Sequence, residues 1–285
     1  MRNLNPYDGN TTDFFDDVVA ARRPSDKDPN FVTRVVTYRP GIVTAYTAYN
    51  SHIAAQSLMT AVAVGYVNPT KEDLIELYKY KAKIFQKLKY ELTTDENNRL
   101  INTCQNCTIN EVNSFDHILP KDEFPEFAVN PKNLFPSCTQ CNGYKSHVWR
   151  NGADALFLNL FLDVLPTEQY LFANVNVAGN ELEIEYYLEN RNGLDPALFR
   201  LIQSHYNRLH LLERFSDNCE DGIIELINSI SAIKNKLSRE EIREVTISKA
   251  RMDLNKFGHN YWKAITDIAL INSDDFFQYA LDQKG

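Results

Sequence analysis

Two Cys-x-x-Cys pairs have the spacing that most directly suggests chemistry in this sequence. Cys104 and Cys107 form the first pair, and Cys138 and Cys141 form the second. Two residues between thiolates allow both sulfurs of one turn to reach a single ion, and a second such turn completes a tetrahedron. In a cytosolic chain this pattern indicates metal binding before disulfide formation. We therefore expect a structural Zn²⁺ on four thiolates.

The segment between the two pairs exceeds the loop of a simple zinc ribbon and carries Asp116 next to His117. Hydrolysis of a phosphodiester needs a base that activates water and a cation that offsets charge on phosphorus. Histidine suits the first task because its unperturbed pKa of about 6.5 lies near working pH. Asp and Asn oxygens suit Mg²⁺ or Mn²⁺, whereas thiolates suit zinc. Ligand type alone thus separates a structural metal from a catalytic one.

Several sequence elements in this region follow one another in the order typical of one nuclease family. The segments CQNC, FDHILP and NPKNLFPSCTQCNGYK lie within residues 104–145. Together they resemble the HNH endonuclease family, in the zinc-stapled version of its ββα-metal fold. The resemblance covers this region and leaves both flanks without a comparable signal.

The resemblance implies a catalytic centre built from three residues. His117 would be the general base, and Asp116 would bind a catalytic Mg²⁺ or Mn²⁺. Asn142, on the helix after the second cysteine pair, would be the other ligand of that ion and a catalytic residue, where many relatives have histidine.

Three further residues receive roles from the same resemblance. Asn133 matches the family's middle asparagine, which holds the loop bearing the base, and we include it among the catalytic residues. Lys145 matches a basic position that could contact a nucleic-acid phosphate. His147 is open as a phosphate contact or a substitute ligand. Five residues of helix turn through about 500°, which directs His147 away from Asn142, so we keep Asn142 as the ligand.

The expected function is that of a metal-dependent HNH endonuclease that hydrolyses phosphodiester bonds in DNA. Two alternatives stay open. The first is a non-catalytic, zinc-stabilised module that binds nucleic acid or a protein partner, and the second is a nuclease directed at RNA. The helical flanks and acidic balance resemble nuclease subunits of prokaryotic defence systems, which often act beside an ATPase. We therefore expect a role in antiviral defence, with an ATPase or sensor subunit as a partner.

Composition limits the broad class of protein. The 285 residues carry 30 basic and 38 acidic side chains, so the net charge is 30 − 38 = −8. Such a chain does not coat nucleic acid indiscriminately, and contact with DNA requires a local basic patch, bound metal or a partner. The absence of a long apolar run excludes a membrane-spanning helix, and the polar N-terminus lacks the apolar core of a signal peptide. We expect a cytoplasmic protein without membrane contact.

The elements that must position the catalytic residues indicate an α+β fold that is mostly helical. A small zinc-stapled ββα-metal module is inserted between helical flanks, and one β-hairpin follows it. We expect a mainly helical region over residues 1–95, the nuclease module over 96–150, and the hairpin with C-terminal helices over 151–285.

In the first region, the small apolar residues from Thr44 to Val67 predict a buried helix. A clear helix is predicted from Thr70 to Leu92, in which Thr70 caps the first turn and Asp73 lies close to a capping-box position. Lysines on one stripe of this helix are expected to face solvent.

After the module, alternating apolar and polar residues predict a hairpin over 171–188 that turns at Ala178-Gly179-Asn180. Helical spacing then predicts four helices. They cover residues 195–212 with Asp195 as N-cap, 221–236, 238–258 with Ser238 and Glu241 as a capping box, and 261–281.

Overall fold

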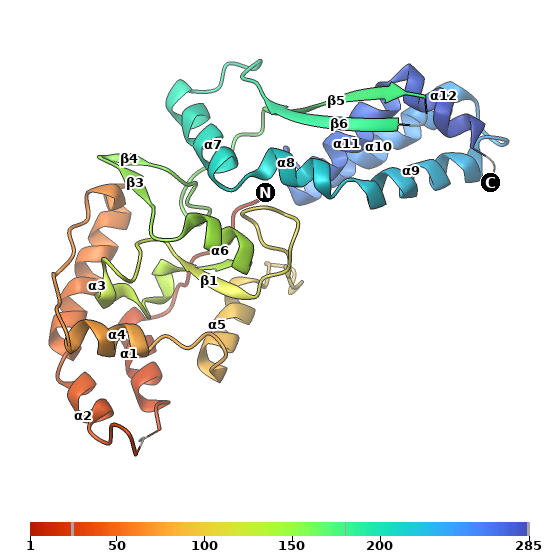
Figure 1. Cartoon of the computed structure of the whole chain (residues 1–285). Coiled ribbons are helices and arrows are strands. Elements are labelled where there is room, and N and C mark those ends of the chain that lie inside the picture. Colours follow the sequence, from red (N-terminus) through yellow and green to blue (C-terminus); the bar gives the residue numbers. More distant parts are fainter. Residues whose placement is uncertain (24–25, 180, 284–285) are drawn as a thin grey trace. The chain divides into compact units, whose positions relative to one another are not determined.

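The computed structural model describes residues 1–23, 26–179 and 181–283 (Figure 1). It is a mostly helical α+β structure with small antiparallel sheets, as predicted. Its contacts divide the chain into two compact units. The N-terminal unit comprises Asn3–Asn106 and Asn110–Asp163, and the C-terminal unit comprises Met1–Arg2, Cys107–Ile109 and Val164–Gly285. The division into regions 1–95, 96–150 and 151–285 stays a prediction.

Helices make up the first part of the N-terminal unit. They are α1 (Thr11–Ala20), α2 (Phe31–Val36), α3 (Arg39–Ala54), α4 (Thr70–Glu76) and α5 (Lys83–Leu92), with a 3-10 turn η1 (Leu58–Thr60). Asn10 caps α1 by accepting hydrogen bonds from the backbone N–H groups of Thr12 and Asp13. Edge-to-face aromatic pairs such as Phe14 with Phe85 and Phe15 with Tyr46 hold these helices together.

The single helix predicted from Thr70 to Leu92 is wrong, because the chain forms α4 and α5 with an irregular segment over 77–82 between them. Thr70 is the first helical residue rather than the cap, which is Pro69. Asp73 instead pairs with the guanidinium of Arg34 at 2.6 Å and accepts a hydrogen bond from the Tyr38 hydroxyl. Tertiary partners therefore override the helical periodicity of this segment.

The buried helix predicted from Thr44 to Val67 is only half present. Helix α3 ends at Ala54, and residues 61–67 form neither helix nor strand. Exposure is high at Val62, Val64 and Val67. The backbone N–H of Val64 donates to the buried carboxylate of Glu126 at 2.8 Å, which ties this irregular segment to η2.

The ββα module lies in the same unit and has the predicted order. Strand β1 (Ser114–His117) pairs antiparallel with β2 (Leu134–Ser137), and helix α6 (Thr139–Lys145) follows directly. The register sets Phe115 opposite Pro136 and His117 opposite Leu134. Two 3-10 turns, η2 (Pro125–Phe127) and η3 (Pro131–Asn133), lead from β1 to β2. The unit also contains the short hairpin of β3 (Arg150–Asn151) and β4 (Asp154–Ala155).

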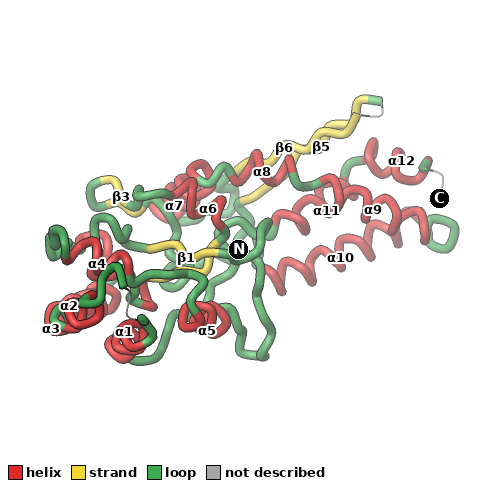
Figure 2. The backbone as a smooth tube through the Cα atoms, turned by 60° about the horizontal axis from the view of Figure 1, so that its bottom comes forward, coloured by secondary structure: helices red, strands yellow, loops and turns green. Residues whose placement is uncertain are grey.

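The C-terminal unit contains the predicted hairpin, formed by β5 (Leu171–Ala178) and β6 (Glu181–Leu188). Of its predicted turn, Asn180 lies outside the described residues. Helices α7 (Pro196–Arg208), α8 (Leu211–Asp217), α9 (Glu220–Ile233), α10 (Arg239–Phe257), α11 (Trp262–Asn272) and α12 (Asp274–Asp282) follow. Figure 2 shows α9, α10 and α11 running alongside one another.

Caps predicted from sequence are confirmed in this unit. Asp195 accepts from two backbone N–H groups at the start of α7, and Ser238 and Glu241 form a capping box on α10. Two predicted helices are each divided, however. Left-handed backbone at His210 separates α7 from α8, and Ser273 ends α11 and caps α12. No helix within the described ranges is long and apolar enough to cross a membrane.

Candidate active site and metal centre

The four cysteines of the two pairs converge as predicted. Their sulfur atoms all lie within 4.8 Å of one another, and all four side chains are buried. A tetrahedral zinc ion with bonds of about 2.3 Å requires sulfurs that approach one another this closely. The cluster is therefore suited to zinc.

Polar groups around the cluster orient its sulfur atoms. The backbone N–H of Cys141 points to the Cys138 sulfur at 3.4 Å, and that of Ile109 points to the Cys107 sulfur at 3.5 Å. The buried Ser137 hydroxyl lies 3.7 Å from the Cys104 sulfur and accepts a hydrogen bond from the Asn106 amide. Ser137 also ends β2, so the same residue belongs to the cluster and to the strand that pairs with β1.

His117 ends β1 with its ring buried. Its Nε2 atom lies 2.9 Å from the backbone carbonyl oxygen of Ala128, which can only accept a hydrogen bond. Nε2 therefore carries the proton, and the lone pair of the neutral ring is on Nδ1, for which the described residues provide no hydrogen-bond partner. Burial lowers the pKa of His117 to about 4, so the ring is neutral at pH 7.

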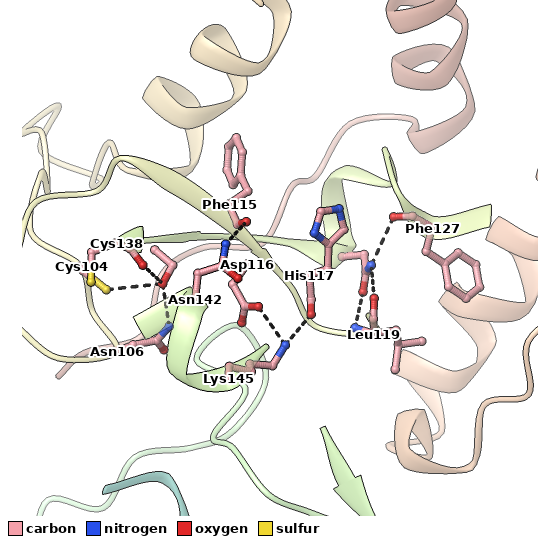
Figure 3. Close-up of polar contacts among 12 residues, drawn as sticks. Cys104, Asn106, Phe115, Asp116, His117, Leu119, Phe127, Cys138, Asn142 and Lys145 are labelled. Atoms are coloured by element: carbon pink, nitrogen blue, oxygen red, sulfur yellow. Dashed lines mark hydrogen bonds and ion pairs between the residues drawn. The ribbon is translucent and has the colours of Figure 1, made fainter. Parts of the chain in front are cut away.

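Asp116 precedes His117 and is paired with Lys145 from the end of α6 (Figure 3). The Lys145 ammonium lies 2.9 Å from Asp116 Oδ1 and also donates to the carbonyl of His117 at 2.5 Å. Both side chains are buried. Burial raises the pKa of the Asp116 carboxyl above its ordinary value, and the ammonium opposes that shift. Lys145 thus forms an internal ion pair in this structure, and its contact with a phosphate stays a prediction.

Asn142 lies on α6, which packs against β1. Its amide nitrogen donates a hydrogen bond to the carbonyl oxygen of Phe115 at 3.1 Å (Figure 3). The amide oxygen of Asn142 can therefore act as a ligand for a cation. One carboxylate and one amide oxygen form a hard donor set that fits Mg²⁺ or Mn²⁺. The adjacent ammonium of Lys145 is the feature of the site that competes with such an ion.

Asn133 is fully buried behind the loop that follows β1. Its amide oxygen accepts from the N–H of Leu119 at 2.8 Å, and its amide nitrogen donates to the carbonyls of Leu119 and Phe127. The hydroxyl of Tyr49 on α3 lies 3.3 Å from the same amide oxygen. These contacts tie the loop to η2, and the next residue after η2 is Ala128, the partner of His117.

His147 is not brought together with the other predicted site residues. Helix α6 ends at Lys145, and Ser146 has a positive φ of 50°, so the helical rotation we used for His147 does not apply. Its exposed ring contacts the Ser146 hydroxyl at 3.2 Å.

Sequence reasoning missed Tyr78, which belongs to the segment between α4 and α5. Its ring contacts that of His117 edge to face, with centroids 4.8 Å apart. The sequence contains no signal for this contact, because Tyr78 fits the apolar stripe of an uninterrupted helix.

Comparison with known proteins adds an evolutionary relationship. No family model matches the chain, and no solved structure matches it. Septu protein PtuB of Bacillus thuringiensis is 23% identical over 194 residues, which cover 66% of this chain and 70% of that protein. Protein ea31 of Escherichia phage lambda is 30% identical over 238 residues, which cover 77% of each chain. Identity at this level over most of both sequences shows that the chain belongs to the same family as protein ea31.

Proposed function

We propose that the chain is a metal-dependent endonuclease of the HNH type that hydrolyses phosphodiester bonds in DNA, with His117 as general base. The observation that carries this proposal is the 2.9 Å contact between His117 Nε2 and the Ala128 carbonyl oxygen, from which the tautomer follows. Because the Ala128 carbonyl holds the proton on Nε2, Nδ1 is the atom that can accept a proton from water. The lowered pKa of the ring keeps it neutral, as a base must be.

Asp116 and Asn142 would hold the catalytic Mg²⁺ or Mn²⁺ through one carboxylate oxygen and one amide oxygen. When bound, such an ion supplies positive charge that offsets the charge developing at phosphorus and on the leaving oxygen. The chain's own residues fix the rest of the geometry. Asn133 holds the loop after β1, and the four cysteines would hold the strands and α6 in place when they bind zinc.

Cleavage of plasmid DNA in Mg²⁺ tests the proposal. We expect His117→Ala to lose about 10²–10⁴-fold in rate, the usual contribution of a general base. The control is His52→Ala, which removes a half-buried histidine of α3 whose ring contacts Ser57. Both variants should retain zinc by metal analysis. Equal cleavage by wild type and His117→Ala would contradict the assignment.

A non-catalytic zinc module is the second candidate, and the Lys145–Asp116 ion pair favours it, because an ammonium already balances the buried carboxylate. Binding of Mn²⁺ distinguishes the two candidates. A nuclease should show paramagnetic broadening of the Asp116 and Asn142 signals that Asp116→Asn removes. A binding module should bind partner or nucleic acid without any such broadening.

We extend the proposal to a role in bacterial antiviral defence beside a partner subunit, such as an ATPase or a sensor. The relationship to a Septu protein supports this setting. Plaque counts on cells that carry the gene in its native neighbourhood test it. Protection should disappear with His117→Ala and remain with His52→Ala.

A further inference from the structure

Tyr78 is held between α5 and β1 by three contacts. The backbone N–H of Phe115 donates to the Tyr78 hydroxyl at 3.3 Å. The Tyr78 ring contacts Phe85 of α5 edge to face at 5.2 Å, and it contacts the His117 ring at 4.8 Å with an interplanar angle of 78°. The ring therefore has little freedom to move away from the imidazole.

The break between α4 and α5 makes these contacts possible. The N–H of Tyr78 bonds to the Ile75 carbonyl instead of continuing an α-helix, and Ala82 has extended backbone. The side-chain amide of Gln86 donates to the carbonyl of Tyr80, which satisfies a backbone group that the break leaves open. The irregular segment is thus fixed by its own hydrogen bonds, and it projects Tyr78 onto the strand that carries His117.

Two neighbours of different kinds then hold the imidazole. The Ala128 carbonyl fixes Nε2 by a directional hydrogen bond, and the Tyr78 ring lies against the ring by an edge-to-face contact. Together they restrict rotation of the imidazole about its bond to Cβ and leave Nδ1 as the remaining polar atom.

We propose that Tyr78 is a positioning residue for His117, whose aromatic ring keeps the imidazole in the orientation that presents Nδ1 to water. This inference rests on the proposed function of His117. The ring of Tyr78 contacts the imidazole, whereas its hydroxyl accepts a hydrogen bond from the Phe115 N–H of β1. The two parts of the side chain are therefore separable by substitution.

The experiment compares Tyr78→Met, which removes the ring, with Tyr78→Phe, which keeps it, in the zinc-loaded 285-residue chain. The control is Tyr90→Met, a tyrosine on α5 that is 62% exposed. We expect Tyr78→Met to lower kcat for plasmid cleavage by about tenfold or more without a matching rise in KM, as for a misplaced catalytic group. Tyr78→Phe and Tyr90→Met should stay close to wild type.

A second readout is independent of cleavage. Ring-nitrogen NMR shifts report the tautomer of His117, and its carbon-bound protons report the ring current of Tyr78. We expect wild type and Tyr78→Phe to share the Nε2–H tautomer and the ring-current shift, and Tyr78→Met to lose the shift and populate a second tautomer. The thiolate charge-transfer band of Co²⁺-substituted protein should be unchanged throughout.

Wild-type kcat together with unchanged His117 signals in Tyr78→Met would overturn the inference. If Tyr78→Met does not fold, wild type and Tyr78→Phe decide. A ring-current shift of the His117 protons in both proteins supports the inference. The absence of that shift overturns the inference. If wild type itself cleaves no DNA, the proposed function fails while the NMR comparison still tests the role of Tyr78.

Discussion

Each unit contains a buried aspartate paired with a lysine, and the two pairs differ in the surroundings of the lysine. In the N-terminal unit, Lys145 Nζ lies 2.9 Å from Asp116 Oδ1, and the lysine side chain is 7% exposed. In the C-terminal unit, Lys249 Nζ lies 2.8 Å from Asp267 Oδ2, but the lysine side chain is 59% exposed and also approaches Asp253. The two pairs therefore have nearly equal nitrogen–oxygen distances but differ in how strongly water screens the lysine charge.

Water accounts for the difference. The Lys249 ammonium keeps much of its hydration, so removal of the lysine lets water replace it. The Lys145 ammonium has exchanged its hydration for Asp116 and the carbonyl of His117, which fixes it to the strand of the candidate site. A buried pair adds little net stability, but breaking it leaves an uncompensated buried charge. The comparison indicates that Lys145 fixes the positions of Asp116 and the His117 carbonyl, whereas Lys249 attracts Asp267 through a charge that solvent screens.

The largest expected effect separates the β1–β2–α6 module from helices α9 to α12 by metal dependence. Because structural zinc contributes about 10 kcal/mol or more to small zinc modules, Cys138→Ser should unfold the β1–β2–α6 module. Helices α9 to α12 have an apolar core and should keep their protection. Amide hydrogen exchange over residues 114–145 and 220–282 measures both. The control is Cys219→Ser, which changes a buried cysteine outside the cluster whose thiol donates a hydrogen bond to the Ser216 carbonyl. Equal loss of protection in both stretches would contradict this expectation.

The next effect tests the two ion pairs directly. Lys145→Met should lower the free energy of unfolding by about 3–5 kcal/mol, because it leaves the Asp116 carboxylate buried without a partner. Lys249→Met should cost about 1 kcal/mol or less, since that lysine is exposed. Urea unfolding measures both losses. Adding Asp116→Asn to Lys145→Met should recover part of the loss, and similar losses from the two lysine variants would remove the distinction between the pairs.

Acid should act through His117 and Asp267 with opposite sign. Burial lowers the pKa of His117 to about 4. As the pH falls from about 6.5 toward 4, the unfolded chain binds a proton that the folded chain does not, so up to about 3 kcal/mol of stability is lost. Burial raises the pKa of Asp267, so the folded chain takes up that proton first, and stability from this group rises as the pH falls through the raised pKa.

Unfolding measured against pH in wild type, His117→Phe and Asp267→Asn checks both signs. The His117→Phe protein should lose less stability than wild type between pH 6.5 and 4. The Asp267→Asn protein should lose more stability than wild type as the pH falls through the raised pKa of Asp267, because it lacks the stabilising protonation of that carboxyl. The same slope in all three proteins would mean that neither group titrates as the structure indicates.

The smallest effect concerns helix caps. Ser238→Ala should cost about 1 kcal/mol, because the Ser238 hydroxyl and the Glu241 carboxylate satisfy backbone N–H groups at the start of α10. Thr70→Ala should lower the free energy of unfolding by no more than about 0.5 kcal/mol, since Thr70 makes no capping hydrogen bond at α4. Thermal unfolding of the two variants measures the difference, and a larger loss for Thr70→Ala would show that the cap assignments are reversed.

Sequence reasoning was most successful where structure depends on local chemistry. Cysteine spacing predicted the cluster, alternation predicted the β5–β6 hairpin, and polar residues before apolar runs predicted the caps at Asp195 and Ser238. It failed where a helical pattern crosses a break. The segments predicted as helices over 70–92, 195–212 and 261–281 are each divided, because periodicity continues in the sequence while the backbone turns to meet tertiary partners.

The candidate site was predicted in part. Sequence identified Asp116, His117, Asn133 and Asn142, which lie on or beside the paired strands and α6. It did not predict that Lys145 pairs with Asp116, that the Ala128 carbonyl fixes the tautomer of His117, or that Tyr78 contacts its ring. The helical rotation used for His147 was also inapplicable, since α6 ends before it.

The sequence by itself determined which atoms are available: four thiolates for zinc, an imidazole, a carboxylate and an amide for hydrolytic chemistry, and the local signals for strands, turns and caps. Only the tertiary structure decided how those atoms are used. A backbone carbonyl has the same chemistry at every residue, and an aromatic ring can pack against any apolar neighbour. Their selection as partners of His117 therefore depends on segments that are distant in the chain and meet only when it folds.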